Sequence, residues 1–488
     1  MNLRDQARES FSWSILIQLS NQIIGFIVSI ILARILFPKD FGIIGMISIF
    51  ITLGNSLLDG GLASSLIRNK DVNQDDYSTV FFTNIVVAII IYAFLFLIAP
   101  LVALFFNQTI LTNLLRIYGI VLLIGSLSIV QSVRLNKNLQ FKTQFKLLIP
   151  SVIISAIVSI WMAYNGFGVW SLVWKEIVFS GLASCQLWYY AKWKPSYVFN
   201  KELFKFHFNF GSKLLITDIL TTFFNDFYKI IVGKFFSATQ LGFYTRAKST
   251  QELPSNIIFN SINRVLYPLL SNINNDDVRL KKVFRQIIET VHFLVVPILV
   301  LLAFVAKPLF IFLLTDKWIE AVPYFKILII AALLSPMQSY MFNICKVKGR
   351  SDLVLKLSSL QYLLLALGLI PSIWFGIFGL LWAIVFVTAI TSAITAYYSG
   401  KLIGYTLKEQ LLDVYQPFLI SAFAGLLLFI LSHFLNITIH SNLFIILFSS
   451  MVFILMFFLM SLILKNSVFV SGLTYLKTRF NLNQVKND

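Results

Sequence analysis

The sequence predicts an all-α polytopic membrane protein with about fourteen transmembrane helices, arranged as two pseudo-symmetric six-helix lobes plus two extra C-terminal helices. Three observations predict this class. Of the 488 residues, 58% are hydrophobic and only 12% are charged. The apolar residues gather in long runs, and the basic residues gather between these runs. Since a soluble domain carries about twice this share of charged residues, lipid is the natural solvent for most of the chain.

A transmembrane helix needs about 20 predominantly apolar residues. Runs of this length recur along the whole chain, separated by short polar connections. The first run follows a basic N-terminus, but it continues without a small-residue cleavage site, so we interpret it as a helix rather than a signal peptide. The runs predict spans at residues 10–33, 42–67, 79–106, 112–133, 147–164, 168–190, 211–233, 250–271, 288–314, 322–345, 355–375, 377–399, 416–435 and 442–464.

The basic residues indicate the orientation of these spans. The formal net charge is +18, from 39 Lys and Arg against 21 Asp and Glu. Most Lys and Arg fall in alternate connections, on the side that also holds both termini. Cytoplasmic loops carry an excess of Lys and Arg, so we expect both termini to be cytoplasmic. A charge of this size could also attract nucleic acid, but no nucleic-acid motif accompanies it and we expect no such partner.

Two segments about 200 residues apart share one pattern, which indicates an internal repeat. Residues 33–42 end the first span and begin the second, and residues 233–242 do the same for the seventh and eighth. Each segment carries a cation, two apolar residues, a turn and an apolar–Gly pair in register. Six spans per repeat would make the repeats parallel. The predicted organisation is an N-terminal lobe over 1–190, a cytoplasmic linker over 191–213, a C-terminal lobe over 214–400, and helices thirteen and fourteen with a cytoplasmic tail over 401–488.

Polar side chains follow one face of the first two spans of each half. At about 100° per residue, Gln18 and Asn21 share a face of the first span, and Asp59 lies on a polar face of the second. The corresponding faces of the seventh and eighth spans carry Asp218, Asn225 and Lys229, with Asp226 at the edge, and Glu252, Asn256 and Asn260. Equivalent helices thus present polar faces at equivalent heights, which predicts a hydrophilic cavity between the halves.

Simpler interpretations of these residues stay open. Small polar residues can also hold membrane helices together. The charged residues favour a cavity or a salt bridge, because an unpaired charge against lipid is unfavourable. Asp226 and Lys229 lie three residues apart and could form an ion pair on the helix surface. Arg264 could extend its charge to the membrane boundary, and Lys175 and Glu176 could neutralise each other.

The residues that usually mark catalysis or cofactor binding do not form motifs. Cys185 and Cys345 lie in apolar stretches and suggest no disulfide framework. The four histidines have no metal-ligand spacing. The sequence contains no phosphate-binding loop and no nucleophile elbow. We therefore expect no catalytic residue, no metal and no cofactor.

An ordered set of short motifs covers most of the chain. It includes Ala33-Arg34-Ile35-Leu36-Phe37-Pro38, Asp59-Gly60-Gly61-Leu62, Gly166-Phe167-Gly168-Val169-Trp170, Ile231-Val232-Gly233-Lys234-Phe235, Leu241-Gly242-Phe243-Tyr244 and Asp316-Lys317-Trp318. In these motifs the chain resembles the flippases of bacterial polysaccharide synthesis, the O-antigen and colanic-acid exporter type. They belong to the multidrug/oligosaccharidyl-lipid/polysaccharide superfamily. One departure is Asn225, where the family pattern often has Arg.

The resemblance implies an alternating-access flippase in the bacterial cytoplasmic (inner) membrane. Its cargo would be a polyprenyl-diphosphate-linked oligosaccharide for cell-surface polysaccharide such as O-antigen, capsule or exopolysaccharide. Membrane lipid and other polysaccharide-assembly proteins would be further partners. Candidates for contact with the diphosphate are Arg116, Lys229, Arg246, Lys248 and Arg264. Candidates for contact with the sugar are Gln18, Asn21, Asn225, Asn256 and Asn260. Candidates for ion coupling or gating are Asp59, Asp218, Asp226 and Glu252.

Two other function classes can be weighed against this one. A proton- or cation-coupled small-molecule antiporter of the multidrug type shares the architecture and is the alternative. Fourteen rather than twelve spans, and several cations around the predicted cavity, favour an anionic lipid-linked sugar over a cationic drug. A membrane polymerase or ligase typically needs a sizeable outer loop, and the predicted outer loops are short.

Overall fold

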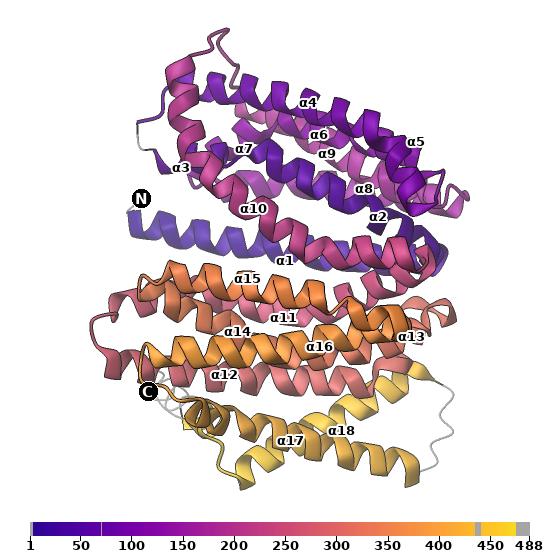
Figure 1. Ribbon diagram of the computed structural model, residues 1–488, viewed down its shortest axis with the longest axis vertical. Helices are drawn as coiled ribbons and strands as arrows, with labels where there is room; N and C mark the ends of the chain where they lie inside the picture. Colours follow the sequence, from indigo (N-terminus) through magenta and orange to yellow (C-terminus); the bar gives the residue numbers. More distant parts are fainter. Residues whose placement is uncertain (1–2, 70, 435–440, 475–488) are drawn as a thin grey trace, which may run out of the picture. The chain divides into compact units, whose positions relative to one another are not determined.

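The computed structural model describes residues 3–69, 71–434 and 441–474 of the chain. Every regular element in these ranges is a helix (Figure 1). The predicted all-α class is therefore confirmed. The chain divides into two compact units, Met1–Thr245 and Arg246–Asp488, with the division inside one long helix.

The first unit contains ten helices and the start of an eleventh in its described part. They are α1 (Leu3–Ile35), α2 (Pro38–Asp59), α3 (Leu62–Arg68), α4 (Gln74–Phe106), α5 (Leu111–Tyr118), α6 (Ile120–Ser126), α7 (Ile129–Lys137), α8 (Phe141–Tyr164), α9 (Trp170–Ala191), α10 (Lys201–Phe235) and the first turns of α11 (Ala238–Asn272). One core cluster joins α1 to α8 through Val28, Leu32 and Ala156. Small residues such as Ala156 allow membrane helices to approach closely.

The second unit holds the rest of α11 and the helices that follow it. They are α12 (Asp277–Phe304), α13 (Ala306–Leu314), the short 3₁₀ helix η1 (Asp316–Trp318), α14 (Ala321–Val347), α15 (Ser351–Leu367), α16 (Ile370–Lys401), α17 (Leu407–Phe434) and α18 (Asn442–Ile463). The pair α17 and α18 lies side by side (Figure 1). Phe293 of α12 packs with Ile420 of α17 and Phe457 of α18 in a shared core cluster.

In the described ranges, nine helices are long and apolar enough to cross a membrane, or ten when the bent segment from Leu111 to Lys137 is taken as one span. These match ten of the fourteen predicted spans. The other four fall on helices α9, α10, α11 and α15. The charged residues of α9, α10 and α11 lower their hydropathy, and α15 has only 17 residues. The count of fourteen therefore stays a prediction.

The predicted span at 112–133 is not one straight helix. It is divided into α5, α6 and α7, with a bend of 44° before α7. Near the bend, Ser126 Oγ donates to the Leu123 carbonyl at 2.8 Å, and Ser128 Oγ donates to the Gly125 carbonyl at 3.1 Å. Serine hydroxyls that bond back to the helix backbone often bend helices, and these two lie at the break between the helices.

The internal repeat is visible in helix boundaries. Helix α1 ends at Ile35 and α2 begins at Pro38, while α10 ends at Phe235 and α11 begins at Ala238. Within the first unit, the two segments of the repeat also contact each other, and each makes the same contact with the other. A Cβ added to Gly42 would overlap the Ala238 carbonyl, and a Cβ added to Gly242 would overlap the Pro38 carbonyl. Positions 200 residues apart thus make the same contact in both directions, which supports the repeat over these helices.

Helix α10 packs on α2, α3 and α4, and this explains why the first unit extends to Thr245. Gly61 is in the left-handed region at φ +67°, and a Cβ added to it would meet the Gly211 carbonyl oxygen at 2.5 Å. A Cβ added to Gly211 would meet the Gly60 carbonyl oxygen, also at 2.5 Å. The preceding residues 192–200 have no regular helix, yet they are bonded to the first turns of α4. The predicted linker is thus fixed to the first unit over these residues.

Candidate functional site

The polar faces of α2 and α10 meet in the first unit. Ser56 Oγ on α2 lies 3.3 Å from Thr222 Oγ1 on α10. One turn away, the carboxylates of Asp59 and Asp218 are near enough to repel each other. Asp218 and Asn225 are exposed, and Asp59 is half-buried. The two predicted stripes therefore form one polar seam, named here the α2–α10 seam, which carries two carboxylates.

Lys229 and Asp226 form the ion pair that their spacing predicted. Lys229 Nζ lies 2.8 Å from Asp226 Oδ1, and the side chains are 22% and 14% exposed. A half-buried ion pair lowers the free energy of placing either charge in a membrane. Both side chains stay partly accessible. Lys175 and Glu176 also pair, at 2.9 Å.

The remaining candidates of the first unit lie elsewhere. Arg116 on α5 stacks over the Phe96 ring of α4 at 4.2 Å and donates to the Phe96 carbonyl at 3.3 Å. This places its guanidinium against α4 rather than in the α2–α10 seam. On α1, Gln18 is half-buried and Asn21 is exposed.

The second unit holds the candidates on α11. Lys248 Nζ lies 3.9 Å from Glu252 Oε1, and Asn256 is exposed. Arg246 is only 5% exposed and lies over the buried Trp318 ring at 5.4 Å, so aromatic packing surrounds its charge. The side chains of Asn260 and Arg264 lie outside the described residues.

A buried hydrogen-bond chain at the start of α10 was not predicted from the sequence. His207 Nδ1 lies 2.8 Å from Ser65 Oγ of α3, and His207 Nε2 lies 2.8 Å from Asp76 Oδ1 of α4. Asp76 Oδ2 in turn accepts from the Asn73 backbone N–H at 2.9 Å. The exposed fractions are 0% for His207 and 2–4% for the other two members. The three side chains come from three helices, so the chain joins α3, α4 and α10.

The sequence offered one signal for this chain. Asn73-x-x-Asp76 is a helix-capping pattern that precedes an apolar run. It locates Asp76 at the start of α4, and the structure shows both capping bonds. The histidine partner lies 131 residues further along, and no local pattern connects residues over that distance.

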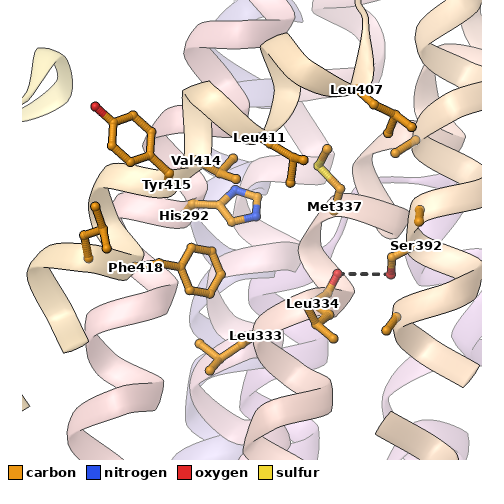
Figure 2. Close-up of a pocket in the computed structure, with 14 residues that line it drawn as sticks. His292, Leu333, Leu334, Met337, Ser392, Leu407, Leu411, Val414, Tyr415 and Phe418 are labelled. Carbon is orange, nitrogen blue, oxygen red and sulfur yellow. Dashed lines mark hydrogen bonds between the residues drawn. The ribbon is translucent and has the colours of Figure 1, made fainter. Parts of the chain in front are cut away.

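The second unit contains an apolar pocket of about 580 Å³ between α12, α14, α16 and α17 (Figure 2). Its lining includes Leu333, Met337 and Phe418, with the His292 ring directed between them (Figure 2). Three polar side chains, those of His292, Ser392 and Tyr415, are among the lining residues, and the first two bond to backbone carbonyls. His292 Nδ1 bonds to the Ile288 carbonyl at 2.8 Å, and Ser392 Oγ donates to the Leu334 carbonyl at 3.2 Å. The pocket therefore suits an apolar chain.

The described residues contain no group of three or more His, Cys, Asp or Glu side chains placed to hold a metal ion.

The sequence pattern of a family described as "Polysaccharide biosynthesis protein" matches residues 31–323, which is more than half of the chain. The chain belongs to this family. The match covers α2, α10 and α11, and it begins in the last turns of α1. The predicted resemblance is thereby confirmed, and the chain is a multi-pass membrane protein of polysaccharide biosynthesis.

Among curated relatives of this family member, the teichuronic acid biosynthesis protein TuaB of Bacillus subtilis (strain 168) is 26% identical, over 76% of this chain and 78% of that protein. The succinoglycan biosynthesis transport protein ExoT of Rhizobium meliloti (strain 1021) is 22% identical, over 67% of each.

Among solved structures, the lipid II flippase MurJ in an inward closed conformation superposes with a TM-score of 0.74 at 16% identity, over 94% of this chain and 99% of that one. A multidrug resistance MATE family transporter in an inward-facing conformation gives 0.58 at 15% identity, over 80% and 98%. At these identities the likeness shows a shared fold.

Proposed function

We propose that this chain is a flippase that moves a polyprenyl-diphosphate-linked oligosaccharide across the bacterial cytoplasmic membrane by alternating access. The observation that carries the proposal is the family match together with a MurJ-like fold over 94% of the chain. Relatives are named for teichuronic acid and succinoglycan biosynthesis, and one of them is named a transport protein. The product would be cell-surface polysaccharide, and both termini would be cytoplasmic.

The chemistry of the cargo fits the features of the two units. An oligosaccharide needs hydroxyl and amide partners, which the α2–α10 seam supplies through Ser56, Thr222 and Asn225. A diphosphate needs a cation that can leave its internal partner, and Lys229 is such a cation. A polyprenyl tail needs an apolar surface, and the pocket beside Phe418 offers one. The same chain thus carries surfaces suited to all three parts of the cargo.

In this proposal, Asp59, Asp218 and Glu252 serve coupling or gating. A coupling ion bound beside Asp59 and Asp218 would offset the repulsion between their like charges. Lys248 and Glu252 can pair or separate as the cavity changes shape. Arg246 and Arg116 would contact the cargo while they stay packed on the aromatic rings of Trp318 and Phe96. The predicted cavity between the halves would join these groups into one pathway.

The proposal is tested by reconstituting the full chain in liposomes with a fluorescent polyprenyl-diphosphate sugar and following quenching of the dye by a membrane-impermeant reductant. Transbilayer movement above that of protein-free liposomes is expected. A proton- or cation-coupled multidrug antiporter is the second candidate, favoured by the MATE-like fold. Drug efflux driven by an ion gradient, with no movement of the lipid-linked sugar, would replace the flippase with the antiporter.

A further inference from the structure

The irregular segment at residues 192–200 is held firmly on α4. The Trp193 indole donates to Gln74 Oε1 at 2.7 Å, and Gln74 Nε2 donates to the Lys194 carbonyl at 2.7 Å. The Ser196 backbone N–H donates to Ser78 Oγ at 3.0 Å. Trp193 is 6% exposed and packs in a core cluster with Phe81. Since these side chains fix one side of the segment, the others are presented outward on a rigid base.

Three outward side chains of this segment and of the first turns of α10 are aromatic. Tyr197 is 99% exposed, and Phe199 and Phe206 are each 56% exposed. The Tyr197 ring stacks at 6.5 Å on Phe82, which holds it in place without covering it. Fixed aromatic rings on a membrane protein are most stable at the level of the lipid headgroups, so this surface belongs at the membrane boundary.

Exposed lysines are interspersed with these rings along the chain. Lys192, Lys194, Lys201 and Lys205 are all exposed, and none of them has an acidic partner in the described part of the chain. Glu202 is the single acidic residue between positions 192 and 206. The seven residues Lys192, Lys194, Tyr197, Phe199, Lys201, Lys205 and Phe206 are called the basic–aromatic surface below.

We propose that the basic–aromatic surface is a binding site for anionic phospholipid headgroups, which anchors the start of α10 to one leaflet. Basic clusters beside a membrane helix bind anionic lipid because its surface potential is negative, and the rings add apolar contact at the same depth. The shared chemistry is a phosphate group, and the lipid is favoured over free phosphate because the rings lie among the lysines. This proposal is independent of the cargo.

The site also has a consequence for the fold. Helix α10 begins directly after the fixed segment, and His207 ties its second turn to α3 and α4. Anionic lipid would therefore hold the same end of α10 that the buried hydrogen bonds hold. Lipid bound there would oppose any motion that lifts this end away from α4.

The test uses the full-length protein in detergent micelles, titrated with phosphatidylglycerol or phosphatidylcholine, with bound lipid counted by native mass spectrometry and Tm recorded. For K201Q/K205Q we expect at least a threefold loss of retained phosphatidylglycerol, and loss of most of the rise in Tm that this lipid gives the wild type. The Tm without lipid should be unchanged, because both lysines are exposed. Phosphatidylcholine retention should also be unchanged.

The matched control is K39Q/K307Q, which removes two exposed lysines from segments predicted to lie on the other side of the membrane and should retain phosphatidylglycerol as the wild type does. A Tyr197→Ser variant should lose part of the lipid effect while keeping all charges. Equal phosphatidylglycerol retention by K201Q/K205Q and wild type would overturn the proposal. An equal rise in Tm with inorganic phosphate alone would also overturn it, in favour of a free-anion site.

Discussion

His207 is the residue on which the start of α10 depends. Its two ring nitrogens bond to Ser65 and Asp76, which belong to two other helices, and all three side chains are buried. Removing one member of such a network leaves the others desolvated and unpaired. The effect should therefore be larger than that of an exposed residue on the same helix.

We predict that His207→Ala lowers the free energy of unfolding by about 1–3 kcal/mol, because Asp76 Oδ1 is left buried without its hydrogen-bond partner. Ser65→Ala should lose about 1 kcal/mol, the contribution of one hydrogen bond. Equilibrium unfolding in mixed micelles measures both changes. Glu202→Gln, at an exposed position of the same helix, is the control and should change little. Additive losses in Ser65→Ala/His207→Ala would argue against a coupled network.

At the residue scale, substitutions of Lys229 test whether this side chain binds the diphosphate of the cargo. We expect Lys229→Glu to abolish transport of the lipid-linked sugar in liposomes, with folded protein still recovered, because the diphosphate would lose its cation and face a second carboxylate beside Asp226. The exchange Asp226→Lys/Lys229→Asp keeps the ion pair but moves the cation by one helical turn. If the pair is only structural, this exchange will transport normally; if Lys229 meets the diphosphate, transport will fall about tenfold or more, equivalent to about 1.4 kcal/mol.

Arg116→Glu separates two roles of its guanidinium. The side chain stacks on Phe96, so its loss should affect both the α4–α5 contact and any contact with cargo. Expression and Tm report the first, and transport per folded molecule reports the second. Normal transport by folded Arg116→Glu would remove this residue from the proposed site.

Tyr405 predicts in which direction the stability of the protein changes with pH. It lies in the connection between α16 and α17, only 1% exposed, and its hydroxyl donates to Asp413 Oδ2 at 2.6 Å. Burial, and then the bond to Asp413, raises the pKa of Tyr405 above its usual range. The folded protein therefore holds this proton more tightly than the unfolded chain, whose tyrosine pKa is about 10. The stability from this group is complete below about pH 10 and is lost as the pH rises further.

We expect the Tm of the wild type to fall more steeply above about pH 10 than that of Tyr405→Phe, which cannot ionise. Below this pH the variant should be somewhat less stable, since Asp413 loses one of its partners. Parallel Tm curves for the two proteins through the alkaline range would contradict this assignment.

At the scale of elements, the helix crossing at Gly42 and Gly242 is the feature that repeats. Each glycine lets one helix approach the first residue of the other. A methyl group at either position would overlap a backbone carbonyl, and backbone cannot move aside as a flexible side chain can. The crossing therefore constrains both α2 and α11 to begin at this point.

We predict that Gly42→Ala and Gly242→Ala each destabilise the protein by about 1–3 kcal/mol or more through overpacking. Gly25→Ala is the matched control, because a Cβ at Gly25 of α1 would meet no atom within 4 Å. It should be neutral or slightly stabilising, since alanine is the better helix former. Thermal unfolding in detergent measures all three. Equal Tm values for Gly42→Ala and Gly25→Ala would show that the crossing tolerates a side chain.

At the scale of the whole molecule, each unit is held together by contacts that join distant parts of the sequence. In the second unit, Arg285 of α12 is bonded to Asp413 of α17, and Lys281 pairs with Glu409 at 2.9 Å. These pairs attach the C-terminal helices to the repeat that precedes them. The charge pattern predicts that this end of α12 lies on the cytoplasmic side, together with both termini.

The orientation can be measured with single cysteines in a Cys185→Ser background, since Cys345 is buried. We expect a membrane-impermeant maleimide added to intact cells to label a cysteine at Asn165, in the short turn after α8, and to spare one at Lys201. Labelling at Lys201 alone would reverse the predicted orientation.

The sequence by itself determined the class of fold, the position of ten apolar spans and the family. These features are local, because hydropathy is read within one helix, and the family motifs are short. It also predicted the ion pair of Asp226 and Lys229, since their spacing on one helix is fixed by helix geometry. It placed Asp59 and Asp218 on polar faces, but it could not show that these two faces meet.

Tertiary structure alone decided which distant residues come together. The partner of Asp76 is 131 residues away, and helix periodicity carries no information over that separation. Helix α7 begins after a bend, and the serine hydroxyl at this bend has a backbone partner only in the folded chain. The segment after α9 was predicted as part of a cytoplasmic linker because it lies between two predicted spans, and only its bonds to α4 show that it is fixed. The chemical type of each side chain is known from the sequence, whereas the partner that it contacts depends on how the helices pack.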